Sequence, residues 1–400
     1  MRRRRFADIE ESTALYVDAA TGSDTNQGTA LAPLATIARA NALLGSYPLV
    51  TTIYVAAGTY SEEVVSAKAG ITYVSAANAI IDGADTRRGF TITHANVSIT
   101  GFEIRNVTDG VRATGAGATG CVANGLTVHA ISNIGIYFTT SAHGGSALNC
   151  TIYDSEQMAV AWFNADSGLC ENCEAYSIAV KALYAYNSPN TVFRDCYVHD
   201  TPGSAYGYEC EGNSDDVLFV RCWAYNLRHG FISKTSLRTR FEACVAWDIS
   251  SFAFYCKAGI DTSIWHCVAY ACTTGVELSD NSGTPPGSSG ANVKNSIFQE
   301  CTTAINVSDD GSDTGIDADF NDFFGNGFVG NWLGATQITL ANWRAASGQD
   351  ANSYALDPAF VTTVQGGFVL PPGSALENAG TDLGGTDPTP DLGREGSSLP

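Results

Sequence analysis

Charged side chains recur at one position of a short alternating pattern in the middle of the sequence. The segments AYGYEC (205–210), GFISKT (230–235) and FAFYCK (252–257) contain Glu209, Lys234 and Lys257. If these segments stack as parallel strands, the three side chains form one column with a step of about 5 Å. A lysine between a carboxylate and another lysine can have its pKa moved toward neutrality, and it can then act as a general base. We therefore predict Glu209, Lys234 and Lys257 as catalytic candidates.

The same alternation predicts which other side chains point outward from this sheet. Two of them, Tyr184 and Tyr186, are flat amphipathic surfaces of the kind that stack on sugar rings. The predicted outward residues that would contact a substrate are Tyr137, Tyr184, Tyr186, Glu211, Tyr255 and Glu277, with Arg112 on the same face. An alternative reading is a solubilising ladder of opposite charges with only a modest gain in stability.

Acidic residues gather near the end of one of these segments. Glu209, Glu211, Asp215 and Asp216 supply the oxygen ligands that Ca²⁺ prefers, but their spacing does not match a defined calcium loop. We expect a solvated acidic turn and no metal or other cofactor, with Ca²⁺ as the alternative.

Regularly spaced cysteines predict the framework that positions these residues. The gaps between Cys150, Cys173, Cys196, Cys222, Cys244 and Cys267 are 23, 23, 26, 22 and 23 residues. A repeat of this period is typical of a solenoid. One cysteine per coil predicts an interior column of reduced thiols that act as small hydrophobic side chains. Cys170 and Cys173 form a C-x-x-C pair, but without a second pair it indicates neither zinc nor redox chemistry.

The chain separates into three zones. Residues 1–97 form an N-terminal region with strands at 15–19 and 52–60 and a short amphipathic helix at 36–44, which caps the open end of a solenoid. Residues 98–316 hold the repeats, and residues 317–400, rich in Pro and Gly, form a closing cap that runs back along the stack.

Composition excludes several functions. The net charge is -20, so nucleic acid and anionic membranes are poor partners. No apolar stretch is long enough to insert into a membrane. No secretory signal is visible, because no apolar region follows the basic run Arg2–Arg5. Reduced cysteines without a signal fit a virion protein assembled in a host cytoplasm, and an extracellular location is the alternative.

Three segments carry a resemblance to a known family. They are YVDAATGSDTNQGTALAPLATIARA with IYVAAGTY, the Asn/Asp-Cys-x-apolar repeats, and LDPAF…GGFVLPPGSALENAGTDLGGTD. Together they resemble the right-handed parallel β-helix, or pectin-lyase-like, superfamily. The resemblance implies an all-β, single-stranded solenoid of roughly 10 coils. The superfamily contains lyases, hydrolases, epimerases and phage tailspikes, which mostly share polysaccharide ligands, so the fold alone does not assign the chemistry.

The resemblance also suggests where chemistry occurs. In this superfamily the ligand groove follows the outer face of one sheet, and lyases often use Lys or Arg. Arg228-His229-Gly230 is loosely similar to the Gly-His-Gly element of galacturonan hydrolases, which adds His229 as a catalytic and Arg228 as a binding candidate. The Asp residues that those hydrolases need are replaced by Lys181 and Ser204, which disfavours hydrolysis.

Aromatic side chains form a second outward column beside the cysteines. Its members are Tyr153, Tyr176, Tyr225, Trp247 and Tyr270, with His199 interrupting. A stripe of this size is rarely left in water, so we predict a packing partner, either another chain of a trimer or the C-terminal tail. A glycan platform is the alternative.

The leading prediction is a phage tailspike-like or tail-fibre-like protein that binds bacterial surface polysaccharide, with depolymerisation left open. It implies a homotrimer and contacts with other virion proteins. The alternatives are a secreted bacterial lyase that cleaves uronate glycans by β-elimination, and a virion structural or decoration protein without catalysis.

Overall fold

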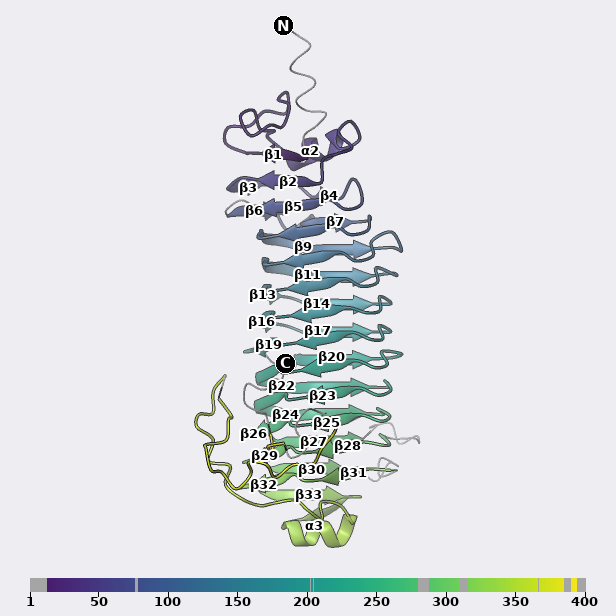
Figure 1. The fold of residues 1–400 in the computed structure, drawn as a ribbon, viewed down its shortest axis with the longest axis vertical. Coiled ribbons are helices and arrows are strands. Elements are labelled where there is room, and N and C mark those ends of the chain that lie inside the picture. Colours follow the sequence, from purple (N-terminus) through teal and green to yellow (C-terminus); the bar gives the residue numbers. More distant parts are fainter. Residues whose placement is uncertain are drawn as a thin grey trace. The chain divides into compact units, whose positions relative to one another are not determined.

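The computed structural model describes residues 13–75, 78–201, 203, 205–279, 288–308, 315–365, 367–384 and 390–393 (Figure 1). The Arg2–Arg5 run and Ser204 lie outside the described residues. The chain divides into two compact units, Met1–Leu183 and Tyr184–Pro400. Both are built mainly of parallel strands wound into coils, with an antiparallel pair of strands, Phe328–Trp332 and Ala335–Gln337, near the end of the second unit. The predicted all-β right-handed parallel β-helix is therefore confirmed, with about 11 turns.

The first unit begins with a strand and a capping helix and continues as coils. Its elements are β1 (Ala14–Val17), α2 (Ile37–Leu43), β2 (Thr52–Val55), β3 (Gly58–Tyr60), β4 (Val64–Val65), β5 (Thr72–Ser75), β6 (Ala79–Asp82), β7 (Phe90–Ile92), β8 (Ser98–Thr100), β9 (Glu103–Thr114), β10 (Val122–Asn124), β11 (Thr127–Thr139), β12 (Ser146–Leu148), β13 (Thr151–Ser155), β14 (Met158–Phe163), β15 (Leu169–Glu171) and β16 (Glu174–Ile178). β17 (Lys181–Tyr186) contains the junction of the units.

The predicted capping helix is confirmed as α2. The side chain of Thr36 caps its N-terminus by accepting a hydrogen bond from Arg39 N at 3.1 Å. The Glu62 carboxylate accepts from Ile37 N and Ala38 N at 2.9 and 2.8 Å, so a negative charge lies at the positive end of the helix. The helix buries Ile37 and packs on β1, β2 and β4, which shields the first coil.

The second unit continues the coils and ends in a helix and an irregular tail. Its elements are β18 (Val192–Arg194), β19 (Tyr197–His199), β20 (Tyr206–Glu211), β21 (Leu218–Val220), β22 (Trp223–Lys234), β23 (Arg240–Glu242), β24 (Val245–Lys257), β25 (Ser263–Trp265), β26 (Val268–Tyr270), β27 (Thr274–Ser279), β28 (Asn292–Lys294), β29 (Ile297–Gln299), β30 (Thr303–Val307), β31 (Asp317–Asp319), β32 (Asp322–Phe324), β33 (Phe328–Trp332), β34 (Ala335–Gln337) and α3 (Leu340–Ser347). Coil strands thus continue to Trp332, beyond residue 316, and α3 follows them.

A regular coil has a short strand, a tight corner, a middle strand and a third strand; in β22 and β24 the last two strands are continuous. The corner residue before each of the six regularly spaced cysteines has a positive φ, as in Asn149, Asn172 and Asp195 (all 53°). Asn and Asp tolerate this left-handed conformation better than most side chains. This tolerance explains why Asn or Asp often precedes the cysteine.

The cysteine column lies inside the solenoid, as predicted. All twelve cysteines are buried free thiols. The thiols of Cys222, Cys244 and Cys267 donate to the carbonyl oxygens of Phe193, Phe219 and Phe241, one coil earlier, at 3.4, 3.5 and 3.5 Å. Each thiol thereby partners a carbonyl group in the buried interior. In the next coil the hydroxyl of Ser296 donates to Ile264 O at 3.3 Å and takes the same role.

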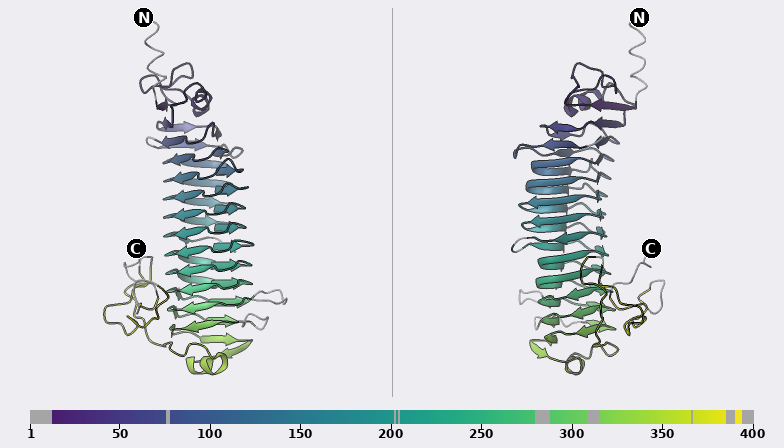
Figure 2. Two further views of the ribbon diagram at one scale, coloured as in Figure 1. Left: turned by 45° about the vertical axis from the view of Figure 1, so that its right-hand side comes forward. Right: turned by 90° about the vertical axis from the view of Figure 1, so that its left-hand side faces the viewer.

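The C-terminal tail runs back along the coils of the second unit, as predicted (Figures 1 and 2). Phe368, Leu370, Leu376 and Leu392 pack on a cluster of coil residues that includes Trp223 and Trp247. Tyr225 and Tyr270 pack against the same cluster. In this unit the outward aromatic column therefore has the tail as its packing partner.

A membrane-spanning helix is absent from the described part of the chain, because neither of its helices is long and apolar enough.

Candidate functional site

The outer surface of β20, β22, β24 and β27 carries most of the predicted site residues. We call its outward residues Glu209, Glu211, Lys234, Tyr255, Lys257 and Glu277 the charged face. The alternate positions point inward, where Tyr208, Phe231 and Phe254 stack with ring centroids 4.6 and 5.2 Å apart. This rigid interior stack holds the outward side chains at fixed spacing.

The register corrects the predicted column of Glu209, Lys234 and Lys257. Glu211, not Glu209, pairs with Lys234, which pairs with Lys257. Glu209 belongs to the adjacent column with Ile232, Tyr255 and Glu277. Aligning the segments 205–210 and 230–235 misplaced Glu209 by two residues, because Tyr208, not Tyr206, pairs with Phe231. Glu211 follows Cys196 by 15 residues, whereas Lys234 follows Cys222 by only 12. The connection between β19 and β20 contains the extra residues.

Glu211 is the centre of a hydrogen-bonded cluster. Tyr184 Oη donates to Glu211 Oε2 at 2.6 Å. Lys234 Nζ donates to Glu211 Oε1 and forms an ion pair with it. The two donors neutralise the carboxylate and orient it, so Glu211 and Lys234 present little net charge to a ligand.

This cluster contradicts the expectation that the Lys234 pKa moves toward neutrality. Desolvation by burial lowers the pKa of Lys234, but the hydrogen bond and charge of Glu211 and the charge of Glu209 outweigh it, and the net shift is upward. Burial, together with the hydrogen bond to Glu211, raises the pKa of the Tyr184 hydroxyl far above its ordinary value. Both groups stay protonated, so neither can serve as a base at neutral pH.

Lys257 differs from Lys234 in its surroundings. Among the residues that the structure describes, no carboxylate lies within ion-pair distance of its ammonium group. It is half-buried, and the exposed Arg228 is a second cation in this part of the unit. Glu209 and Glu277, by contrast, are only 2% and 5% exposed. Of the described side chains on the charged face, Lys257 is therefore the charged one that is neither paired nor buried, and Arg228 adds a second exposed cation in the same unit.

His229 is buried among aromatic rings in the same region. Its ring centroid lies 4.8 Å from Tyr206, 5.1 Å from Phe252 and 6.0 Å from Tyr255. Burial, together with the charges of Arg228 and Lys257, lowers the pKa of His229 to about 4, so the imidazole is neutral at pH 7. Its Nδ1 has no hydrogen-bond partner among the described residues. The imidazole is thus unprotonated at neutral pH, whereas Lys234 and Tyr184 are protonated, but its lowered pKa makes it a weak base.

Other outward residues are covered by their neighbours. Tyr184 and Tyr255 are 3% and 6% exposed, so their ring faces are not open for sugar stacking. Tyr186, tilted by 30° to Tyr184, is half-buried. Asn306 donates from Nδ2 to Glu277 Oε2 at 2.7 Å. Tyr206, Phe252 and Asn306 were not predicted from the sequence as residues of this site. Tyr206 and Phe252 pair in register with His229 on the neighbouring coils.

Tyr137 lies in the first unit, on β11. The Arg112 guanidinium lies over its ring at 5.3 Å, and the ring meets Phe163 edge-on at 5.4 Å. Tyr137 pairs in register with Arg112, as alternation predicted. The structure therefore places it on the same face of its own unit as Arg112.

The aromatic side chains of the column in the first unit stack on one another. The rings of His129, Tyr153 and Tyr176 stack with centroids 4.8 and 4.9 Å apart and planes within 2° of parallel. The ring faces between neighbours cover one another by stacking, so the column presents mainly ring edges to solvent. Stacking on a pyranose needs a free aromatic face.

The acidic turn after β20 engages protein donors. Asp216 accepts two hydrogen bonds from Arg238 at 2.6 and 2.7 Å, and Asp215 accepts one from Leu237 N at 3.0 Å. No group of three or more His, Cys, Asp or Glu side chains suited to a metal ion occurs within the described ranges.

Comparisons with known proteins address the fold. A family model described as "Right handed beta helix region" matches residues 88–237. No curated protein matches the chain. A rhamnogalacturonan lyase is similar with a TM-score of 0.54 and 14% identity, over 89% of this chain and 92% of the lyase.

Two further solved structures are similar. The A-module of the mannuronan C-5 epimerase AlgE6 from Azotobacter vinelandii has a TM-score of 0.58 and 11% identity, over 77% of this chain and 91% of the module. The Dettilon tailspike protein has a TM-score of 0.57 and 13% identity, over 86% of this chain and 69% of the tailspike chain. At these identities the likeness concerns the fold alone, and this chain has the fold of a right-handed parallel β-helix.

Proposed function

We propose that this protein binds a uronate-containing polysaccharide on the charged face, in the manner of a tailspike-like β-helix. The observation that carries the proposal is that the negative charges of this region are paired or buried, whereas two positive charges are open to solvent. Glu211 and Lys234 neutralise each other, Glu209 and Glu277 are buried, and Lys257 and Arg228 remain open to solvent. A carboxylate on each sugar is the ligand group that such cations bind.

The fold supports this ligand class by analogy. The three similar folds reported above belong to a rhamnogalacturonan lyase, a mannuronan C-5 epimerase and a tailspike protein. The solenoid gives a further reason, because it repeats one coil about every 4.8 Å and so presents side chains along a line. A linear polymer can meet several coils of such a surface at once.

Isothermal titration of the full chain with uronate oligosaccharides tests the proposal. Lys257→Ala should weaken binding by about tenfold, the loss expected for a hydrogen bond to a charged group. Lys68→Ala is the matched control, because Lys68 is also half-buried but lies in the first unit and donates to Pro48 O. Absence of uronate binding, or equal affinity of wild type and Lys257→Ala, contradicts the proposal.

A lyase activity is the second candidate, with the unprotonated His229 as the base. In β-elimination a base removes the proton next to the uronate carboxylate, a C=C bond forms, the glycosidic C–O bond breaks with its electron pair on the departing oxygen, and this oxygen takes a proton from water. His229 would take the proton, while Lys257 would stabilise the negative charge that develops on the carboxylate. The unsaturated product absorbs ultraviolet light, so a rise in absorbance that is lost in His229→Gln supports this activity. Binding without cleavage leaves a non-catalytic receptor-binding or virion structural role.

If the protein is a tailspike, we expect a homotrimer that contacts other virion proteins and is located in the virion. If it is a lyase, we expect it outside a bacterial cell. The molecular mass in solution separates these two. A trimer supports the tailspike role, and a monomer that cleaves uronate glycans supports the secreted lyase.

A further inference from the structure

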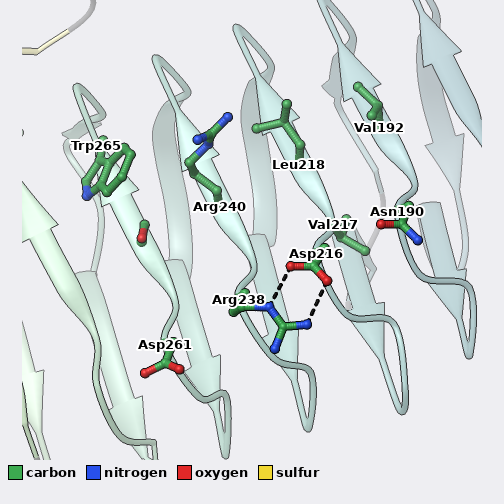
Figure 3. A pocket seen from close by; sticks show the side chains of 10 residues that line it. Asn190, Val192, Asp216, Val217, Leu218, Arg238, Arg240, Asp261 and Trp265 are labelled. Atoms are coloured by element: carbon green, nitrogen blue, oxygen red, sulfur yellow. Dashed lines mark hydrogen bonds and ion pairs between the residues drawn. The ribbon is translucent and has the colours of Figure 1, made fainter. Parts of the chain in front are cut away.

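A groove of about 550 Å³ lies on the outer surface of the short strands of the second unit, on a different sheet from the charged face. Its lining comes from four successive coils (Figure 3). The lining residues form two rows. One row lies at the corners that precede the strands, and the other lies on the strands β18, β21, β23 and β25 themselves. The rows are Asn190, Asp216, Arg238 and Asp261, and Val192, Leu218, Arg240 and Ser263 with Trp265 beside them. We call this site the Trp265 groove.

The floor of the groove is rigid. Behind it, Phe193, Phe219 and Phe241 point inward, are fully buried and stack with ring centroids 4.8 and 5.1 Å apart. The four coils advance by ~14 Å along the stack at about 4.8 Å per step. The lining positions are thus fixed before a ligand arrives, which lowers the cost of ordering them.

The charged groups of the groove are paired with one another. Arg238 donates from Nε and from a terminal nitrogen to the two oxygens of Asp216 at 2.6 and 2.7 Å. Arg240 Nε lies 3.0 Å from Glu242 Oε2, an ion pair that lacks hydrogen-bond alignment. The two guanidinium charges are therefore compensated, and the groove offers no surplus positive charge to an anion.

Trp265 is half-buried and held in a defined orientation. Its Nε1 donates to Asn292 Oδ1 at 2.9 Å, and the Arg240 guanidinium carbon lies 5.6 Å from the ring centroid. Leu218 and Val192 extend the apolar surface over the preceding coils. The result is an apolar strip beside a row of polar corner residues. The strip is interrupted by Arg240, which lies between Leu218 and Trp265 and covers one face of the Trp265 ring, so the other ring face is the one open to a sugar.

We propose that the Trp265 groove binds a neutral oligosaccharide laid along the solenoid. The apolar strip suits the C–H faces of sugar rings, while Asn190, Asp261 and Ser263 can bind their hydroxyl groups. A neutral ligand is favoured over a phosphate or uronate because both arginines already have carboxylate partners. An extended peptide is disfavoured, because β21 and β23 are paired with strands on both sides and offer no free backbone edge.

Titration of the full chain with short neutral oligosaccharides of glucose, xylose, mannose and galactose tests this proposal. Trp265→Ala should weaken binding about tenfold through loss of the aromatic surface, and Trp265→Phe should retain most of it. Trp332→Ala is the matched control, since Trp332 is also half-buried but lies on β33 outside the groove. If Trp265→Ala does not fold, the exposed Asp261→Ala replaces it, with an expected loss of about fivefold.

The outcomes separate this inference from the proposed function, which concerns another face and another ligand. Neutral oligosaccharides that bind the wild type, when uronates do not, support the groove and contradict the proposed function. Uronates that bind when no neutral sugar does at millimolar concentration overturn the groove. Neutral binding that is equally strong in wild type and in Trp265→Ala or Asp261→Ala also overturns it.

Discussion

The carboxyl group of Asp322 should make the attachment of the C-terminal tail depend on pH. Asp322 lies on β32 and is fully buried. Its Oδ1 accepts a hydrogen bond from Leu356 N at 2.8 Å, and Phe323 N donates to Tyr354 O at 3.0 Å. Oδ2 has no partner in the described part of the chain. The residue therefore joins the start of the tail to one of the last coils.

The sign of the effect follows from its pKa. Burial raises the pKa of Asp322 to about 7; the hydrogen bond from Leu356 N opposes the shift, and the charge of Asp357 adds to it. The unfolded chain has a value near 3.9. The folded protein thus binds this proton more tightly, and the resulting stability is complete below pH ~4 and lost as the pH rises to about 7. A difference of about 3 pKa units corresponds to about 4 kcal/mol.

Asp322→Asn removes the titrating group but keeps an oxygen acceptor for Leu356 N. Relative to the wild type, the variant should gain stability steadily between pH ~4 and ~7, by up to about 4 kcal/mol. Hydrogen exchange of the Tyr354 and Leu356 amides, measured across this range, reports the local opening of the tail. Asp382→Asn is the control, because it removes an exposed carboxylate of the same tail. A difference between wild type and Asp322→Asn that does not vary with pH refutes the reasoning.

Three other predictions concern the interior and the tail. Burial raises the pKa of Cys222 and Cys244 well above their usual values, so a thiol reagent should not modify the native protein but should modify all cysteines in denaturant; rapid native labelling contradicts the interior column. Phe231→Ala removes a fully buried ring between two stacked partners and should cost about 3–5 kcal/mol in urea denaturation, whereas a loss below ~1 kcal/mol contradicts tight packing of the stack. Phe368→Ala should loosen the tail over Trp223 and Trp247 and shift tryptophan fluorescence to the red; an unchanged spectrum argues against this contact.

Much of the fold could be predicted from local sequence. The cysteine spacing indicated a solenoid with an interior thiol column, and this is what the structure has. The helix at 36–44 was readable from its own residues, because Thr36 caps it locally. Repeats and caps are properties of short segments, so one chain can specify them without knowledge of distant contacts.

The site depended on tertiary structure. The sequence could place Glu209, Glu211, Lys234 and Lys257 on one sheet face, but not which carboxylate meets Lys234, because connections of different length separate the cysteine column from the third strand. That register makes Glu211 the partner of Lys234, which keeps the lysine protonated. The Trp265 groove likewise exists only once four coils are stacked. Strand alternation is local, whereas pairing between coils and the pKa values that follow from it depend on neighbours about two dozen residues away.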